Sequence, residues 1–183
     1  MFTNRRQAGQ LLSAKLSRFT GKDTLVLGIP RGGMLVAREV AKLLQAPLDA
    51  LVIRKITLPQ NPELAIGAVG PANTVYWDSS LCRQLGVERK IKEERLKVKE
   101  DERNKREMLL RGSKPYPTMS NKTVLVVDDG VATGATSIAA AKFIKKGRAK
   151  KAVLATPVIA TDTLPKVKRY FDELVYLESS GEF

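Results

Sequence analysis

Apolar runs recur along the chain and alternate with segments of helical spacing. A short, continuous apolar run between polar or turn residues is typical of a strand buried on both faces of a parallel sheet. The predicted strands are Thr24–Ile29, Leu48–Ile53, Val124–Val127, Ala152–Val158 and Glu173–Leu177. The predicted helices are Asn4–Leu16, Met34–Leu44, Ala135–Lys146 and Leu164–Tyr170. This alternation predicts an α/β fold with a doubly wound, mostly parallel sheet flanked by helices.

Residues 57–118 do not continue this alternation. Leu64–Val69 and Thr74–Trp77 are joined across a Gly-Pro-Ala-Asn turn, which predicts an antiparallel hairpin. Val87–Leu110 predicts one long, highly charged helix. We therefore expect residues 1–183 to form a single domain in which residues 57–118 are an inserted region containing the hairpin, the long helix and a flexible loop.

The long helix has only a thin apolar stripe, at Val87, Ile91 and Val98. A helix this polar is usually a solvated outer face of the molecule. A narrow subunit contact is the alternative, and the absence of a sustained heptad disfavours it.

The composition is that of a globular protein, with 183 residues, 43% of them hydrophobic and 28% charged. There is no apolar run near the ~20 residues that cross a bilayer and no signal-peptide hydrophobic region, so we expect no membrane contact and a cytoplasmic location. The lone cysteine, Cys82, cannot form an internal disulfide. Because the chain has no histidine, His-based triads and histidine metal sites are excluded. Any metal needs oxygen ligands, and Mg²⁺ carried by a polyphosphate substrate is the natural candidate.

The net charge is +13, from 32 Lys and Arg against 19 Asp and Glu. A basic proteome, a polyanionic small substrate and nucleic acid are three possible explanations. The basic residues are scattered and are not interleaved with aromatic residues, as they would be on a surface that stacks single-stranded bases. Nucleic acid is therefore the less favoured partner.

The segment Val124–Ser137 carries the most chemistry. Its predicted strand ends at the acid pair Asp128 and Asp129, and a Gly- and Thr-rich loop follows, at the start of a helix. Backbone N–H groups at a helix start are unpaired and suit a phosphate, whereas a carboxylate pair can accept hydrogen bonds from a diol. The two together describe a ribose 5-phosphate site.

This segment resembles the phosphoribosyl pyrophosphate (PRPP) motif of the type I phosphoribosyltransferases. The resemblance implies the fold of that family, with a small hood over the acceptor. It assigns the ribose 2′- and 3′-hydroxyls to Asp128 and Asp129. The implied 5′-phosphate residues are Ala132, Thr133, Gly134, Ala135 and Thr136. The family also implies a homodimer. It implies Mg²⁺ as the cofactor, which enters with PRPP. No residue of the protein is then expected to bind the metal directly, unless Asp128 and Asp129 lie near it.

A second loop, Pro30-Arg31-Gly32-Gly33, follows the first predicted strand. Alone it indicates a plain strand-to-helix turn, but beside the PRPP motif it resembles the pyrophosphate loop of the family, which often contains a cis peptide. Arg54 and Lys55 follow the second predicted strand, and the family has a base near this place that reaches the pyrophosphate. Lys55 is the stronger candidate.

Residues 54–69 resemble, more narrowly, a subgroup of bacterial and archaeal predicted phosphoribosyltransferases without a settled substrate. The hood would come from the first helix or from the tail Leu177–Phe183.

The implied reaction transfers 5-phosphoribosyl from PRPP to a nucleobase or another nitrogen acceptor and releases pyrophosphate. Asp128, Asp129, Arg31 and Lys55 are the implied catalytic residues. Hypoxanthine-guanine enzymes have an aspartate where this chain has Ala132, so the base-side acid is unassigned, and Glu63 and Asp78 are only guesses. The alternative function is a PRPP-sensing regulator that binds nucleic acid. PRPP synthetase-like chemistry is disfavoured because such chains are longer.

Overall fold

The computed structural model describes residues 2–181, apart from the side chain of Glu63. Its main sheet is parallel throughout. The strand order across the sheet is β2 (Leu48–Ala50), β1 (Thr24–Gly28), β6 (Thr123–Val127), β7 (Lys151–Ala160) and β8 (Glu173–Ser180). The chain adds strands in one direction from β1 and in the opposite direction from β6, so the sheet is doubly wound, as the sequence predicted.

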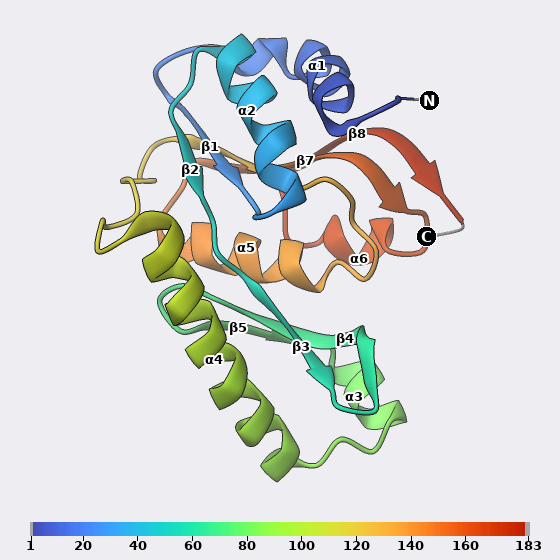
Figure 1. The fold of residues 1–183 in the computed structure, drawn as a ribbon. Coiled ribbons are helices and arrows are strands. Elements are labelled where there is room, and N and C mark those ends of the chain that lie inside the picture. Colours follow the sequence, from blue (N-terminus) through green and yellow to red (C-terminus); the bar gives the residue numbers. More distant parts are fainter. Residues whose placement is uncertain (1, 182–183) are drawn as a thin grey trace.

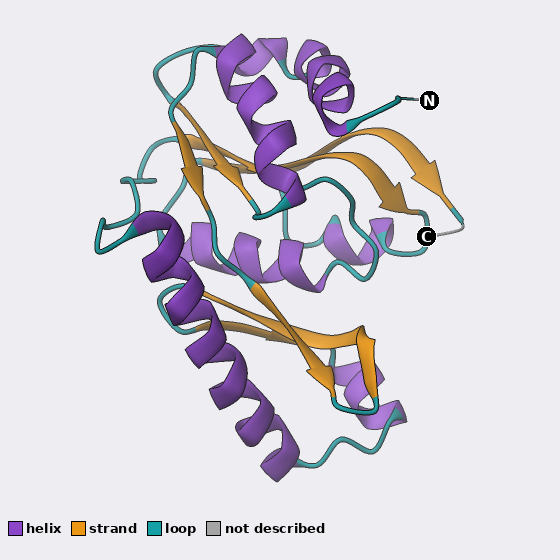
Figure 2. Ribbon diagram, viewed as in Figure 1, coloured by secondary structure: helices purple, strands orange, loops and turns teal. Residues whose placement is uncertain are grey.

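Helices cover both faces of the main sheet (Figures 1 and 2). α1 (Arg5–Lys15) and α2 (Gly32–Leu44) lie on one face, with the short 3₁₀ helix η1 (Ser17–Phe19) after α1. α5 (Ala135–Lys146) and α6 (Leu164–Val167) lie on the other. Side chains alternate between the faces along each strand. Val26 packs with the α1 and α2 cluster, whereas its neighbours Leu25 and Leu27 pack with α5.

A second, antiparallel sheet contains β3 (Arg54–Leu58), β4 (Asn61–Gly70) and β5 (Thr74–Trp77). The β4–β5 hairpin confirms the prediction for that segment. β3 and the helix α3 (Ser79–Gln84) were not predicted. The predicted strand Leu48–Ile53 ends at Ala50, because its last residues cross from the main sheet to β3 while remaining buried. Burial along a crossing segment produces the same apolar run as a strand.

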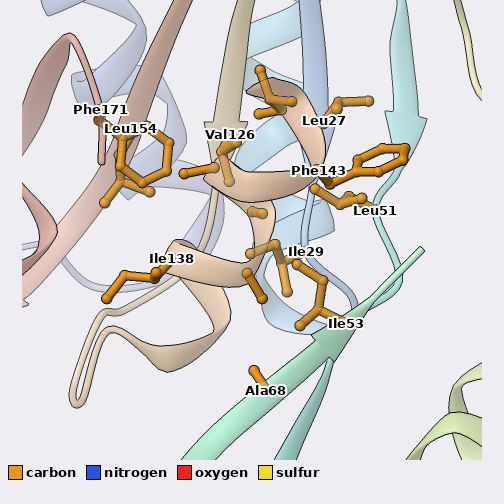
Figure 3. Close-up of a cluster of buried hydrophobic side chains, with 14 of the residues drawn as sticks. Leu27, Ile29, Leu51, Ile53, Ala68, Val126, Ile138, Phe143, Leu154 and Phe171 are labelled. Carbon is orange, nitrogen blue, oxygen red and sulfur yellow. The ribbon is translucent and has the colours of Figure 1, made fainter. Parts of the chain in front are cut away.

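One apolar cluster joins the two sheets through α5. In Figure 3, Leu27 and Val126 of the main sheet lie above Ile138 of α5, and Ala68 of β4 lies below it. Phe143 of α5 belongs to the same cluster. All five side chains are buried. The antiparallel sheet is therefore packed through α5 onto the main sheet, and its position is fixed relative to the carboxyl ends of β1 and β6.

The long helix α4 (Arg89–Arg111) packs along the antiparallel sheet, and its outer face is solvated, as expected (Figure 1). The predicted apolar stripe is partly wrong. Val87 and Leu96 pack against the cluster beneath the sheet, but Ile91 and Val98 are exposed. The sequence could not show which side of a mostly charged helix faces the sheet, because several of its lysine and arginine side chains also lie against the protein.

The carboxyl end of α4 is anchored by Arg111, whose side chain is only 4% exposed. Its Nε and Nη2 donate to the two carboxylate oxygens of Asp49 in β2, at 3.0 and 2.6 Å. The guanidinium also lies 3.6 Å from the ring centroid of Tyr116. This bidentate pair ties the helix to the edge of the main sheet.

Smaller differences occur near the carboxyl terminus. The predicted helix Leu164–Tyr170 is shortened to α6, and β8 runs three residues beyond the predicted Leu177 to Ser180. Residues 182–183 of the predicted hood tail lie outside the described residues. None of the helices within residues 2–181 is long and apolar enough to cross a membrane.

We expect Arg111→Met to lower the free energy of unfolding by about 2 kcal/mol, because it leaves the partly buried Asp49 carboxylate without its partner. The urea unfolding midpoint measures this. Arg89→Met is the matched control, since the Arg89–Glu93 pair of the same helix is solvent-exposed. Equal midpoints for the two variants would contradict the anchoring role of Arg111.

Candidate functional site

A cavity of about 420 Å³ lies where β1 and β6 end. It is bounded by both sheets and by α4. The residues that line it are Ile29, Pro30, Ile53, Arg54, Lys55, Thr57, Pro62, Lys99, Asp128, Asp129, Gly130, Ala132, Thr133, Gly134 and Thr136. In doubly wound sheets, ligands bind in the crevice between the strands from which the chain winds in opposite directions, here β1 and β6.

The strand register places the two predicted loops side by side. Gly28 pairs with Val127, and the Ile29 N–H donates to the Val127 carbonyl at 2.9 Å. Residues 30–33 and 128–129 therefore leave the sheet together. The Pro30–Arg31 peptide bond is cis, the feature that the resemblance raised for this loop.

The close approach of these loops requires Gly32 and Gly33. A Cβ on Gly33 would lie 2.9 Å from the Val127 carbonyl oxygen and 3.0 Å from the Asp128 Cα. A Cβ on Gly32 would overlap the Asp129 carboxylate. The backbone contact therefore requires glycine at position 33, whereas a side chain at position 32 would displace the Asp129 carboxylate. Neither glycine is part of the cavity lining.

The two acids have different environments. Asp128 is buried, and desolvation together with the neighbouring Asp129 charge raises the pKa of its carboxyl well above the ordinary value. The Asp129 side chain is 29% exposed and accepts a hydrogen bond from Arg5 Nε at 2.8 Å. Arg5, the first residue of α1, was not predicted at the site, although the first helix was considered as a hood. The contact is specified by no local pattern, because the two residues are 124 positions apart.

The loop after the acids is attached to β7. The Val131 N–H donates to the Val158 carbonyl at 3.0 Å, and the Ala160 N–H donates to the Val131 carbonyl at 2.8 Å. The next two carbonyls are held by the segment that contains α6. Thr163 Oγ1 donates to the Ala132 carbonyl, and Lys166 Nζ donates to the Thr133 carbonyl at 3.0 Å.

These contacts orient the amides of the loop. A trans peptide directs its C=O and the next N–H in opposite directions. The N–H groups of Thr133 and Gly134 therefore point away from α6, and both residues line the cavity. Gly134 is the N-cap of α5 with φ of +75°, and a Cβ there would lie 2.6 Å from Val167. Together with the positive end of the α5 dipole, these amides have the arrangement that suits an anion.

The cavity also contains three cationic side chains, Arg54, Lys55 and Lys99. Arg54 and Lys55 begin β3 rather than end a strand of the main sheet, so their predicted structural context was wrong, but both line the cavity. The predicted Arg31 side chain is exposed and does not line it. Lys99 was missed, since nothing in the pattern of α4 separates it from the other basic residues of that helix.

Asp78, one of the two guesses for a base-side acid, does not line the cavity. Asp78 caps α3 and pairs with Lys166 Nζ at 2.6 Å. Burial alone raises the pKa of Asp78, but hydrogen bonds from Lys166 and from the Leu81 N–H together lower it. Asp78 is therefore an ionised structural residue. The Glu63 side chain lies outside the described residues.

The oxygen donors suit a metal that arrives with its ligand. Among the side chains that the structure describes, there is no group of three or more His, Cys, Asp or Glu residues that could hold a metal ion. Among the described residues that line the cavity, the acid pair is the only source of carboxylate oxygens. Two carboxylates fit Mg²⁺ when substrate phosphates complete its coordination.

Similar folds occur in solved structures. The crystal structure of TT1426 from Thermus thermophilus has a TM-score of 0.80 and 34% identity, over 100% of this chain and 86% of that chain. Purine phosphoribosyltransferase from Pyrococcus horikoshii Ot3 has a TM-score of 0.56 and 17% identity, over 98% of this chain and 84% of that one. The latter likeness shows the fold alone.

We expect Asp128→Asn to raise the free energy of unfolding at pH 7 and to change it little near pH 4. The folded protein favours the protonated carboxyl, so the wild type loses stability as pH rises from the ordinary aspartate pKa of 3.8 towards the higher folded value. Urea unfolding at both pH values measures the difference, with Asp101→Asn at an exposed position as the control. A destabilised variant at pH 7 would contradict the burial argument.

Sequence comparison gives the family. A curated relative from Mycobacterium tuberculosis H37Rv, provisionally named a phosphoribosyl transferase, is 39% identical over 185 residues, which cover 100% of this chain and 41% of the relative. The chain thus spans about two fifths of the length of the curated relatives it matches. The family profile described as "Phosphoribosyl transferase domain" matches residues 4–180. Because nearly all of the chain takes part in both matches, it belongs to the phosphoribosyl transferase domain family.

Proposed function

We propose that this protein transfers 5-phosphoribosyl from PRPP to a nucleobase or another nitrogen acceptor and releases pyrophosphate. The observation that carries this proposal is that an acid pair, a loop that suits an anion and three cations line one cavity. The cavity is built by both sheets, which supports treating residues 1–183 as one functional unit. The family homodimer and a cytoplasmic location are part of the same proposal.

At the ribose phosphate end, Asp128 and Asp129 would accept hydrogen bonds from the 2′- and 3′-hydroxyls. The 5′-phosphate would lie on the loop residues Ala132 to Thr136, against the amides of Thr133 and Gly134. Ala135 does not line the cavity, but its N–H is in the first turn of α5, where amides have no helical partner. For the ribose to bind there, the hydrogen bond from Arg5 to Asp129 would have to break, or the Asp129 oxygen would have to accept from both Arg5 and the ribose.

At the pyrophosphate end, the backbone of residues 30–33 and the side chains of Arg54 and Lys55 would hold the leaving group. Lys55 is exposed at the cavity, whereas Arg54 pairs with Glu102 at 2.8 Å. Arg31 could contribute its guanidinium only after its side chain moves from the surface. The geometry therefore favours Lys55 and Arg54 over Arg31.

The proposed step balances as a nucleophilic substitution at C1 of the ribose. The acceptor nitrogen donates its lone pair to C1, and the electron pair of the C1–O bond leaves with pyrophosphate. The acceptor nitrogen then loses its proton to solvent water. Positive charge develops on the sugar and negative charge on the leaving group, so the acid pair and the cations lie near opposite developing charges.

Mg²⁺ fits this cavity as a partner of PRPP. When bound, it would neutralise pyrophosphate oxygens, and Asp128 or Asp129 are the residues that would hold it. The protein itself holds the two ends of PRPP in fixed positions and so reduces the entropy cost of the transfer.

A PRPP-sensing regulator is the second candidate, favoured by the net charge of +13. It would use the same cavity without transfer. Salt-dependent binding of RNA or DNA that changes when PRPP is added would distinguish it from the enzyme.

The direct test is pyrophosphate release from PRPP and Mg²⁺ across a panel of nucleobases and amines. We expect release with at least one acceptor, and a rate at least about a hundredfold lower for Asp128→Asn/Asp129→Asn. Asp101→Asn/Asp162→Asn makes the same two substitutions at exposed positions and should behave as wild type. PRPP binding without release would favour the regulator, and no PRPP binding by the wild type would refute both functions.

Gly32→Ala tests the close approach of the two loops. The added methyl group displaces the Asp129 carboxylate, so we expect PRPP affinity to fall at least about tenfold. Because the displaced atoms are the end of a partly exposed side chain that can rotate, we expect stability to fall by less than about 1 kcal/mol. Titration calorimetry and urea unfolding measure the two effects. Gly181→Ala, which meets open space, is the control. Wild-type PRPP affinity in Gly32→Ala would show that the acid pair does not need this contact.

A further inference from the structure

Lys99 is placed unusually for a lysine in the middle of a charged helix. Its side chain is only 14% exposed, whereas Lys97, two positions earlier on α4, is exposed. Lys99 lines the same cavity as Asp128 and Thr133. The part of Lys99 that remains accessible therefore includes a surface that faces the candidate site.

The carboxylate of Glu102 links Lys99 of α4 to Arg54 of β3. Lys99 Nζ lies 2.8 Å from Glu102 Oε1, and Arg54 Nη2 lies 2.8 Å from Glu102 Oε2. These two hydrogen bonds, partly opposed by burial, lower the pKa of the Glu102 carboxyl, so it is ionised at neutral pH. Glu102 thus holds one cation of α4 and one of β3 at the cavity.

The helix that carries Lys99 is fixed on both sides of it. Arg95 Nε donates to the Thr57 carbonyl at 2.9 Å, and Arg111 pairs with Asp49 at 2.6 Å. These anchors are about 24 Å apart along the helix. Because Thr57 itself lines the cavity, the first anchor fixes the helix directly at the site.

The charge at this wall exceeds what Glu102 neutralises. On the side of the cavity formed by β3 and α4, Arg54, Lys55 and Lys99 carry three positive charges, and the Glu102 carboxylate bonds to two of them. The acid pair lines the same cavity from the end of β6. A lysine ammonium has three donors, so Lys99 can keep its bond to Glu102 and still donate to a ligand oxygen. A phosphate-rich group is the ligand class that this surplus favours.

We propose that Lys99 binds the pyrophosphate group of PRPP and that Glu102 positions it together with Arg54. This inference rests on the proposed function and adds a cation from α4 to the leaving-group end of the site. Lys99 would stabilise the negative charge that pyrophosphate gains as the C1–O bond breaks. The long helix is then a wall of the substrate site and not only an outer face.

The test is titration calorimetry of PRPP, pyrophosphate and ribose 5-phosphate, each with Mg²⁺. Lys99→Met should lower the affinity for PRPP and for pyrophosphate roughly ten- to a hundredfold and leave the affinity for ribose 5-phosphate unchanged. Lys97→Met removes the same charge from the exposed side of α4 and should match the wild type. Lys99→Arg, which keeps a cation, should recover most of the lost affinity.

Other results would overturn the assignment. Unchanged pyrophosphate affinity in Lys99→Met, or an equal loss for ribose 5-phosphate, would refute a role at the pyrophosphate end. A wild type that binds neither PRPP nor pyrophosphate would refute the proposed function as well, so the two failures are distinguishable. If Lys99→Met does not fold, Lys99→Gln is measured with the same expectation.

Discussion

The candidate site depends on the close packing of two loops at the carboxyl ends of β1 and β6. The strand register starts both loops at the same level, and the absence of side chains at Gly32 and Gly33 lets α2 begin against the acid pair. This contact also buries Asp128, whose ionisation is thereby made unfavourable. The fold thus accepts a cost in stability at the acid pair, as is common where function requires a buried polar group.

The antiparallel sheet and α4 complete the site that the main sheet begins. The main sheet supplies acids and backbone amides, while β3 and α4 supply Arg54, Lys55 and Lys99. The apolar cluster around α5 holds the two parts together, and Arg111 fixes the far end of α4 on β2. The proposed substrate carries phosphate groups at both ends. A cavity with the loop of residues 132–136 on one side and the cations of β3 and α4 on the other fits this distribution of charge.

Local sequence patterns were sufficient to predict the helices and strands whose burial is uniform along their length. Val124–Val127 is apolar throughout because both faces of the strand are covered, and the acids mark its end. β3 was missed because Leu51 to Ile53 remain buried while they cross between sheets, so the apolar run does not end where β2 ends. The wrong apolar stripe on α4 has a related cause. Its inner face includes Arg103 and Lys99, whose apolar methylene stems lie against the protein although the residues count as charged in the sequence pattern.

The sequence by itself determined the doubly wound sheet and the order of acid pair, Gly- and Thr-rich loop and helix, and it led to the family through the PRPP motif. These features depend on residues that are neighbours in the chain, where hydrophobic period, turn chemistry and helix starts leave local signatures. Only the tertiary structure decided that Arg5 contacts Asp129, that the Arg31 side chain lies outside the cavity and that Lys99 lies inside it. Each of these depends on how separate elements pack, and one solvated cation cannot be told from another until that packing brings it to a site.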